Sequence, residues 1–235
     1  MNMPPALSKD DIMVMPRVLG DREALVRYGD KDLCLVTFYA EFDRDSLQDI
    51  FDAIPGITIA AVHVRDWNSE LSPWEAPPVF GEEGFGDGAK DMLSFIEDIL
   101  IPDLACKEYI IGGYSLAGLF SLWACYESES FRGCAAASPS VWFPRWDEYI
   151  RDRRMNSDHV YLSLGDKESK TRNQLMSKVS DRIQLQYDTL RRTMGEDVIL
   201  EWNEGNHFRD FTERKIKAYS WVVEKVQDSL LEDDC

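Results

Sequence analysis

Short apolar runs alternate with longer amphipathic segments along most of the chain. The runs have the residue types of strands and cover residues 12–18, 24–28, 33–39, 58–64, 109–114, 133–138, 160–164 and 198–202. Apolar positions at helical spacing fill the intervals 46–54, 88–101, 116–125, 173–194 and 209–230. From residue 33 onward the order is a repeated β-α-β pattern. It predicts an α/β fold with a mostly parallel central sheet, an antiparallel N-terminal strand pair and helices on both faces.

One long polar segment, residues 66–87, interrupts this rhythm and is rich in proline and glycine. Loops longer than about 12 to 15 residues are uncommon inside a compact domain and usually have a function. The whole chain has 235 residues, of which 44% are hydrophobic and 29% charged. That mixture is typical of a globular protein, and the length favours a single domain over residues 1–235.

The excess of acidic residues argues against anionic partners. Lys and Arg number 26 against 43 Asp and Glu, which gives a net charge of −17. A field of that sign repels polyphosphates and anionic lipid surfaces, so we expect neither nucleic acid nor a membrane as a partner. The sequence carries no indication of oligomeric state.

Neither a targeting segment nor a membrane span is indicated. The first residues lack a basic start followed by an apolar run, and no stretch of about 18 uninterrupted apolar residues occurs. The five cysteines are scattered without C-x-x-C spacing. We therefore expect a cytoplasmic protein with reduced thiols and without a metal site.

The strongest candidate for chemistry is the segment 109–120, YIIGGYSLAGLF, where an apolar strand runs directly into an amphipathic helix. A serine on a strained strand-to-helix turn needs small residues two positions before and after it, as Gly113 and Ala117 are. We predict Ser115 as a nucleophile above the carboxyl ends of the strands, with the N–H of Leu116 as one oxyanion donor. The alternative is that the serine only caps the helix.

A nucleophilic serine needs a base, and the chain has three histidines. His63 lies inside a predicted strand, as a core histidine does, and His159 lies in a polar turn where we expect it to be exposed. His207 follows the last strand, where the histidine falls in the chain order serine, acid, histidine. The acid should follow the penultimate strand, where the order along the chain does not separate Asp166 from Glu168.

With these residues in place, the chain resembles the α/β-hydrolase superfamily, and within it the esterase group that includes esterase D and the enterochelin esterases. Further matching segments are 65–74, 85–88 with the helix after it, and 137–142. Hydrolases of this architecture commonly place the acid three residues after the glycine that ends the strand. That favours Glu168 and leaves Asp166 as the alternative acid. The interval between Ser115 and Glu168 is too short for a large cap domain.

The resemblance implies a serine esterase that acts on a small or medium ester through a Ser-His-acid triad and an acyl-enzyme intermediate, without metal or organic cofactor. Related enzymes often supply the second oxyanion donor from a glycine-rich turn after the third strand. This chain has Ala40 there, with Glu41 and Asp43 close by. We expect the N–H of Ala40 to be the second donor.

Three tryptophans in the predicted loops at the carboxyl ends of strands are the candidate substrate-binding residues: Trp67, Trp74 and Trp142. The alternative for each is that it packs its loop against the body of the protein. Several carboxylates fall near the predicted site, namely Glu70, Glu75, Glu82, Glu83, Asp87 and Glu204. They favour a neutral or cationic ester as substrate. Alternatives are an acyltransferase or thioesterase with the same triad, and a non-catalytic binding protein on the same fold.

Overall fold

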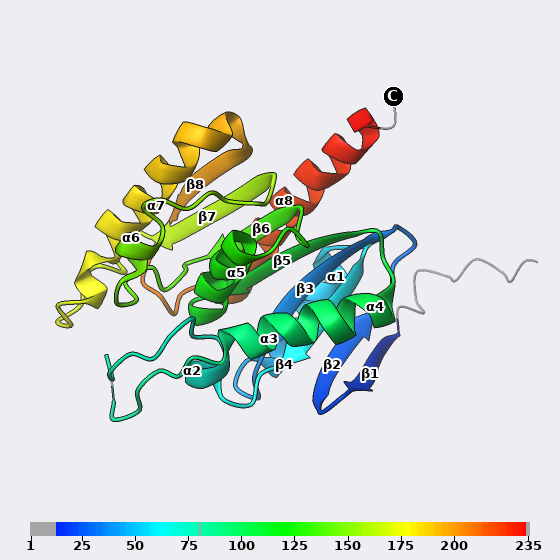
Figure 1. Cartoon of the computed structure of the whole chain (residues 1–235), viewed down its shortest axis with the longest axis horizontal. Coiled ribbons are helices and arrows are strands. Elements are labelled where there is room, and N and C mark those ends of the chain that lie inside the picture. Colours follow the sequence, from blue (N-terminus) through cyan, green and yellow to red (C-terminus); the bar gives the residue numbers. More distant parts are fainter. Residues whose placement is uncertain (1–12, 80, 234–235) are drawn as a thin grey trace, which may run out of the picture.

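The computed structural model describes residues 13–79 and 81–233, and its strands form one open eight-stranded sheet (Figure 1). The strands are β1 (Val14–Leu19), β2 (Arg22–Arg27), β3 (Leu33–Tyr39), β4 (Thr58–His63), β5 (Glu108–Tyr114), β6 (Gly133–Ala137), β7 (His159–Gly165) and β8 (Val198–Asn203). Their order across the sheet is β1-β2-β4-β3-β5-β6-β7-β8. Strand β2 is antiparallel to both of its neighbours, and all other neighbours are parallel. The predicted sheet is confirmed; residue 12, where its first strand was expected to begin, lies outside the described residues.

The predicted helices are all present, with shifted ends. The predicted intervals correspond to α1 (Leu47–Ala53), to α3 (Ala89–Phe95) with α4 (Ile101–Leu104), and to α5 (Leu116–Glu127), α7 (Val179–Met194) and α8 (Phe211–Asp233). Two short helices, α2 (Trp67–Glu70) and α6 (Trp146–Tyr149), were not predicted. A π-helical stretch, η2 (Ile96–Leu100), joins α3 to α4, and short 3-10 turns are η1 (Arg44–Ser46), η3 (Met176–Lys178) and η4 (Gly195–Asp197). The segment 66–87 is not all loop. It begins with α2, whose first turn is capped by the Asp66 carboxylate accepting the Ser69 N–H at 3.0 Å.

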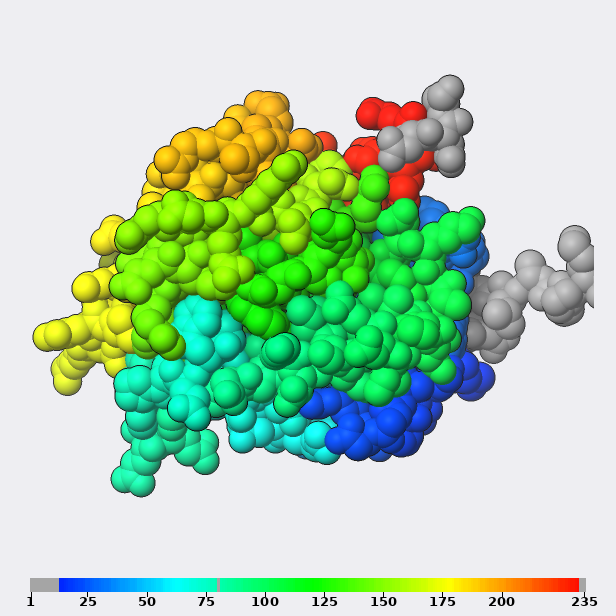
Figure 2. Space-filling model, in the orientation of Figure 1, coloured from blue at the N-terminus to red at the C-terminus, as the bar shows by residue number. Residues whose placement is uncertain are grey.

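The helices cover both faces of the sheet, as the pattern predicted, because strand side chains alternate between two buried layers. On β3, Cys34, Val36 and Phe38 join the layer covered by α3, α5 and α7, whereas Leu35 and Tyr39 join the layer covered by α1 and α8. In the space-filling view the helices hide most of the sheet, and part of the segment after α2 projects from the body (Figure 2). Among the described helices, none combines the length and apolar character that a membrane crossing requires.

Candidate active site

Ser115 lies in a strained turn between β5 and α5. Its φ of 60° and ψ of −120° are rare for a residue with a side chain. The turn is tight because Gly113 and Ala117 approach each other closely: a Cβ on Gly113 would lie 2.5 Å from the Ala117 carbonyl carbon. This is the close packing that the small residues predicted. It places Ser115 just after the carboxyl end of β5, at the edge of the sheet.

His207 and Glu168 reach this serine from two other loops at the same edge. The Nε2 atom of His207 lies 3.0 Å from the Ser115 Oγ, and its Nδ1 atom lies 2.7 Å from the Glu168 Oε2. Glu168 lies in the loop after β7, and His207 in the loop between β8 and α8. The structure therefore brings the three side chains together in a serine–histidine–carboxylate arrangement.

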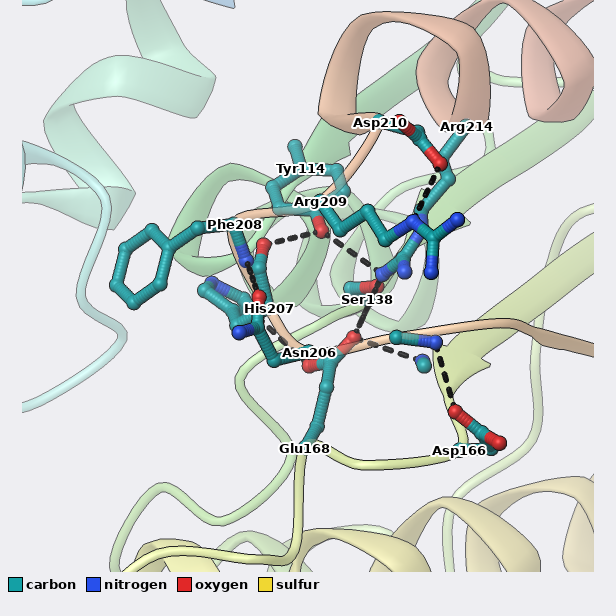
Figure 3. Close-up of polar contacts among 12 residues, drawn as sticks. Tyr114, Ser138, Asp166, Glu168, Asn206, His207, Phe208, Arg209, Asp210 and Arg214 are labelled. Carbon is teal, nitrogen blue, oxygen red and sulfur yellow. Dashed lines mark hydrogen bonds and ion pairs between the residues drawn. The ribbon is translucent and has the colours of Figure 1, made fainter.

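Asp166, the alternative acid, contacts a different part of the site. Its Oδ1 atom accepts the Gly205 N–H at 2.7 Å, and its side chain shows no contact with His207 (Figure 3). Gly205 has a φ of +106°, so this bond fixes a turn just before the histidine. Glu168 therefore contacts the imidazole, whereas Asp166 supports the loop that carries His207.

The two expected oxyanion donors, the N–H groups of Leu116 and Ala40, differ in whether they already have an acceptor. Leu116 is the first residue of α5, so its N–H has no acceptor within the helix. The N–H of Ala40, in contrast, donates to the Asp43 Oδ1 at 2.9 Å. Ala40 is thus not the free donor expected, because the aspartate three residues later folds back onto its amide. The Glu41 side chain points to solvent, with 72% of its surface exposed.

Two cavities meet at Ser115 and His207. One has a volume of about 310 Å³ and is lined by Phe38, Phe42, Asp43, Trp67, Tyr114, Phe208, Phe211 and Lys215. The other, of about 400 Å³, is lined by Trp67, Asn68, Phe85, Leu116, Ser140, Trp142, Met176 and Phe208. Trp67 and Phe208 border both, so these two side chains stand between the cavities.

The three candidate tryptophans divide accordingly. Trp67 and Trp142 line cavities beside the serine, as expected, whereas Trp74 lines neither. Its indole N–H donates to the Pro144 carbonyl at 2.9 Å, and its ring packs against Phe143, Trp146 and Tyr149. Trp74 therefore anchors its loop to the body, which was the alternative role.

His159 also differs from its prediction. It is only 6% exposed, since it begins β7 and the C-terminal half of α8 covers it. Its Nε2 atom lies 2.7 Å from the Ser229 Oγ and its Nδ1 atom 3.3 Å from an Asp197 oxygen. The Ser229 hydroxyl donates to the Lys225 carbonyl, so this serine is not activated by the imidazole.

The site contains two further charged residues whose position there the sequence pattern does not indicate. Arg214 and Lys215, both 3% exposed at the start of α8, form ion pairs with Glu168 and Asp43 respectively. In the sequence they stand in a polar stretch, FTERKIK, that looks like a solvated helix face. The described residues contain no group of three or more His, Cys, Asp or Glu arranged to hold a metal ion.

The strand order and the serine turn define the α/β-hydrolase fold. Solved structures of this fold resemble the chain over most of its length at low identity. An IroE-like serine hydrolase from Shewanella oneidensis superposes with a TM-score of 0.65 and 16% identity, over 85% of this chain and 73% of that one. The enterobactin esterase FES from Shigella flexneri gives a TM-score of 0.65 and 13% identity, over 89% of this chain and 60% of that one.

A third neighbour is nearly the same size. The esterase Pf2001 from Pyrococcus furiosus superposes with a TM-score of 0.55 and 12% identity, over 94% of this chain and 98% of that one. No family model matches the chain, and no curated protein matches its sequence. Its structural neighbours are thus serine hydrolases and esterases, and the likeness establishes the fold they share.

Proposed function

We propose that the protein is a carboxylic-ester hydrolase with Ser115 as nucleophile, His207 as base and Glu168 as the acid that orients the base. The observation that carries this proposal is the continuous relay from the Ser115 Oγ through the imidazole, at 3.0 Å and 2.7 Å, to the Glu168 carboxylate. The strained backbone of Ser115 supports it, because strain of this kind is retained where function requires it.

In the proposed mechanism, His207 Nε2 takes the hydroxyl proton of Ser115 as the oxygen attacks the ester carbonyl carbon. The tetrahedral intermediate collapses as the imidazolium gives that proton to the leaving alcohol, which leaves an acyl group on Ser115. A water molecule, deprotonated by His207 in turn, then attacks the acyl carbon and releases the carboxylic acid. Glu168 holds Nδ1 protonated and stabilises the charged ring in both steps.

The oxyanion needs two donors in this mechanism. The Leu116 N–H, at the N-terminus of α5, is the first. Since the Ala40 N–H is bonded to Asp43, we assign the second to one of the next two amides of the same turn, Glu41 or Phe42. Phe42 lines the smaller cavity beside Ser115, which supports this choice of turn.

The two cavities point to the substrate class. Both are bordered mainly by aromatic and aliphatic side chains, so each suits an apolar group on one side of the scissile ester. Asp43 and Lys215, the charged pair among the residues lining the smaller cavity, neutralise each other at 3.2 Å. Glu70 is likewise paired, with Arg22 at 2.5 Å. We propose a neutral ester of small or medium size; equal rates on matched neutral and anionic esters at low salt would contradict this.

The proposal is tested with four variants on 4-nitrophenyl butyrate. Ser115→Ala and His207→Ala should each lower kcat/KM by about 1,000-fold or more, and Glu168→Gln by between about 100- and 10,000-fold. Asp166→Asn is the matched control for the acid. The asparagine oxygen can still accept the Gly205 N–H, more weakly than a carboxylate, and the side chain does not contact the ring, so we expect a loss of roughly three-fold or less. Activity in Ser115→Ala near that of the unmodified protein would contradict the mechanism.

The alternative functions give different results with two probes. A fluorophosphonate should label Ser115 in a serine hydrolase and leave a non-catalytic binding protein unlabelled. An acyltransferase would divert the acyl group to a competing alcohol, and a thioesterase would prefer a thioester over the matched oxygen ester. The relay at Ser115 supports catalysis of some kind, and the product assay separates these reactions.

A further inference from the structure

The guanidinium of Arg214 contacts Glu168 through the carboxylate oxygen that does not face His207. Although Arg214 is charged, it is only 3% exposed. Its Nη1 atom lies 3.0 Å from the Glu168 Oε1, 3.3 Å from the Tyr114 hydroxyl and 3.4 Å from the Ser138 Oγ. Its Nη2 atom donates to the Glu204 carbonyl at 3.0 Å. One side chain therefore joins four segments of the site. Figure 3 shows Arg214 beside Tyr114, Ser138 and Glu168.

The two oxygens of the Glu168 carboxylate have different partners. Oε1 accepts from Arg214, from the Ser138 hydroxyl at 2.8 Å and from the Gly165 N–H at 2.7 Å. Oε2 faces the His207 Nδ1 at 2.7 Å. This division fixes the rotation of the carboxylate, because three donors hold one oxygen and leave the other directed at the imidazole.

The carboxylate is also buried, with 4% of the Glu168 side chain exposed. An ionised carboxylate without a nearby cation is costly to bury, whereas one with a cation and several donors is stabilised. Arg214 supplies that cation from the side opposite His207. A guanidinium suits this position because its donors diverge in a fixed plane and reach several acceptors at once.

We propose that Arg214 is a positioning residue for catalysis, which offsets the buried charge of Glu168 and keeps its Oε2 directed at His207. The proposal rests on the proposed function, since it assigns Arg214 an effect on the same triad. Arg214 acts through Glu168, since it makes no hydrogen bond to Ser115 and lines neither cavity. Its removal should therefore change the reaction only as long as Glu168 is present.

Arg214 also sets the charge around the Glu168–His207 pair. Other titratable groups near this pair or its loops include Tyr114, Asp166, Glu204, Arg209 and Asp210. Asp43 and Lys215 line the cavity that His207 borders and pair with each other at 3.2 Å. The exposed Arg209 is already paired with Glu204 at 2.8 Å and Asp210 at 3.2 Å, which leaves Arg214 as the cation in contact with the carboxylate. In general, a nearby positive charge disfavours protonation of a carboxylate or an imidazole. Loss of Arg214 should move the acid limb of the kcat/KM profile to higher pH.

A double-mutant cycle tests the proposal. Arg214→Met, which keeps the length of the side chain without its charge, should lower kcat/KM on 4-nitrophenyl butyrate on the order of 100-fold. In the Glu168→Gln background the same substitution should cost roughly three-fold or less. Arg214→Lys retains the positive charge but lacks the diverging, coplanar N–H groups of the guanidinium. It should lose about ten-fold, again only with Glu168 present, and leave the acid limb in place.

Arg27→Met is the matched control for loss of a buried arginine. Arg27 is 1% exposed and donates to the carbonyls of Ile54 and Ile57 at 2.6 Å and 2.7 Å, remote from the triad. It should lower the melting temperature and leave kcat/KM per labelled active site and the acid limb unchanged. Rates of the variants that retain Ser115 are normalised to the fraction of enzyme that a fluorophosphonate labels, and the rate of Ser115→Ala is given per total protein.

The outcomes separate this proposal from the proposed function. If Ser115→Ala keeps full activity, the proposed function fails. If Ser115→Ala is inactive but Arg214→Met costs the same with Glu168 present and in the Glu168→Gln background, or leaves the acid limb unmoved, only the role of Arg214 fails. If Arg214→Met does not fold, Arg214→Lys is compared with Glu168 present and in the Glu168→Gln background, and an equal loss in both would likewise contradict the role of Arg214.

Discussion

The Lys215 Nζ atom lies 3.2 Å from the Asp43 Oδ2, and neither side chain is more than 9% exposed. Asp43 also accepts the Ala40 N–H, and the lysine contacts the Ser46 Oγ at 3.3 Å. This ion pair thus joins the turn after β3, from which we expect an oxyanion donor, to the start of α8. Burial lowers the pKa of Lys215, whereas the charge of Asp43 raises it.

Removing the lysine should be costly, because it leaves a buried carboxylate without its cation. We expect Lys215→Met to lower the free energy of unfolding by about 3 to 5 kcal/mol. The double variant with Asp43→Asn should lose less than the sum of the single variants. Urea denaturation measures all three. Lys31→Met, at an exposed lysine bonded to Gln227, is the control and should change stability by less than about 0.5 kcal/mol. Additive losses would show that the pair is not coupled.

The serine turn makes a second prediction. In Gly113→Ala the new methyl group would lie 2.5 Å from the Ala117 carbonyl carbon and 2.6 Å from its Cβ, so the turn has to open and Ser115 moves. We expect kcat/KM to fall on the order of 100-fold. Gly195→Ala is the control, since Gly195 has a φ of +61° with open space around it at the end of α7. It should lose about 1 to 2 kcal/mol of stability and keep its rate per active site. Similar kinetic losses in the two variants would contradict this explanation.

Trp67 and Trp74 allow a matched comparison of binding and packing. Trp67 borders both cavities, so Trp67→Ala should raise KM for an ester with bulky apolar groups by about ten-fold or more. Trp74 packs among aromatic rings outside the cavities, so Trp74→Leu should lower the free energy of unfolding by about 2 kcal/mol and leave KM unchanged. Steady-state kinetics and urea denaturation of both variants measure this. A higher KM in Trp74→Leu would place that residue in the binding site after all.

The sequence predicted the sheet, its antiparallel start and the covering helices because strand and helix periodicity survive in the order of residues. It also predicted Ser115, Glu168 and His207, which the structure brings together, because chain order and loop position restrict where such residues fall. Their roles remain predictions until the variants are measured.

What the sequence did not predict depends on contacts between distant segments. Arg214 and Lys215 look like solvent-facing residues of an amphipathic helix, and their burial arises because α8 begins under the loops that follow β3 and β7. The Ala40 amide looked free because periodicity does not indicate that Asp43 folds back onto it. His159 looked exposed because its neighbours before the strand are polar, whereas α8 covers it from the far end of the chain.

His159 makes the last prediction, on stability against pH. Burial lowers the pKa of His159 from its ordinary value of 6.5, although the charges of Asp197 and Asp158 partly oppose this shift. Below about pH 6.5 the unfolded chain then binds a proton that the folded protein does not, so the free energy of unfolding should fall as the solution is acidified. The loss amounts to about 1.4 kcal/mol for each unit by which the pKa is lowered.

His159→Gln removes this titration and should therefore show a smaller decline in unfolding free energy between pH 7.5 and pH 5.5, measured by urea denaturation at both values. Ser229→Ala is the matched control, because it removes the partner 2.7 Å from Nε2 but keeps the imidazole. It should be less stable at both pH values and retain the decline. If the decline is as large in His159→Gln as in the unmodified protein, other groups account for it and the buried imidazole does not.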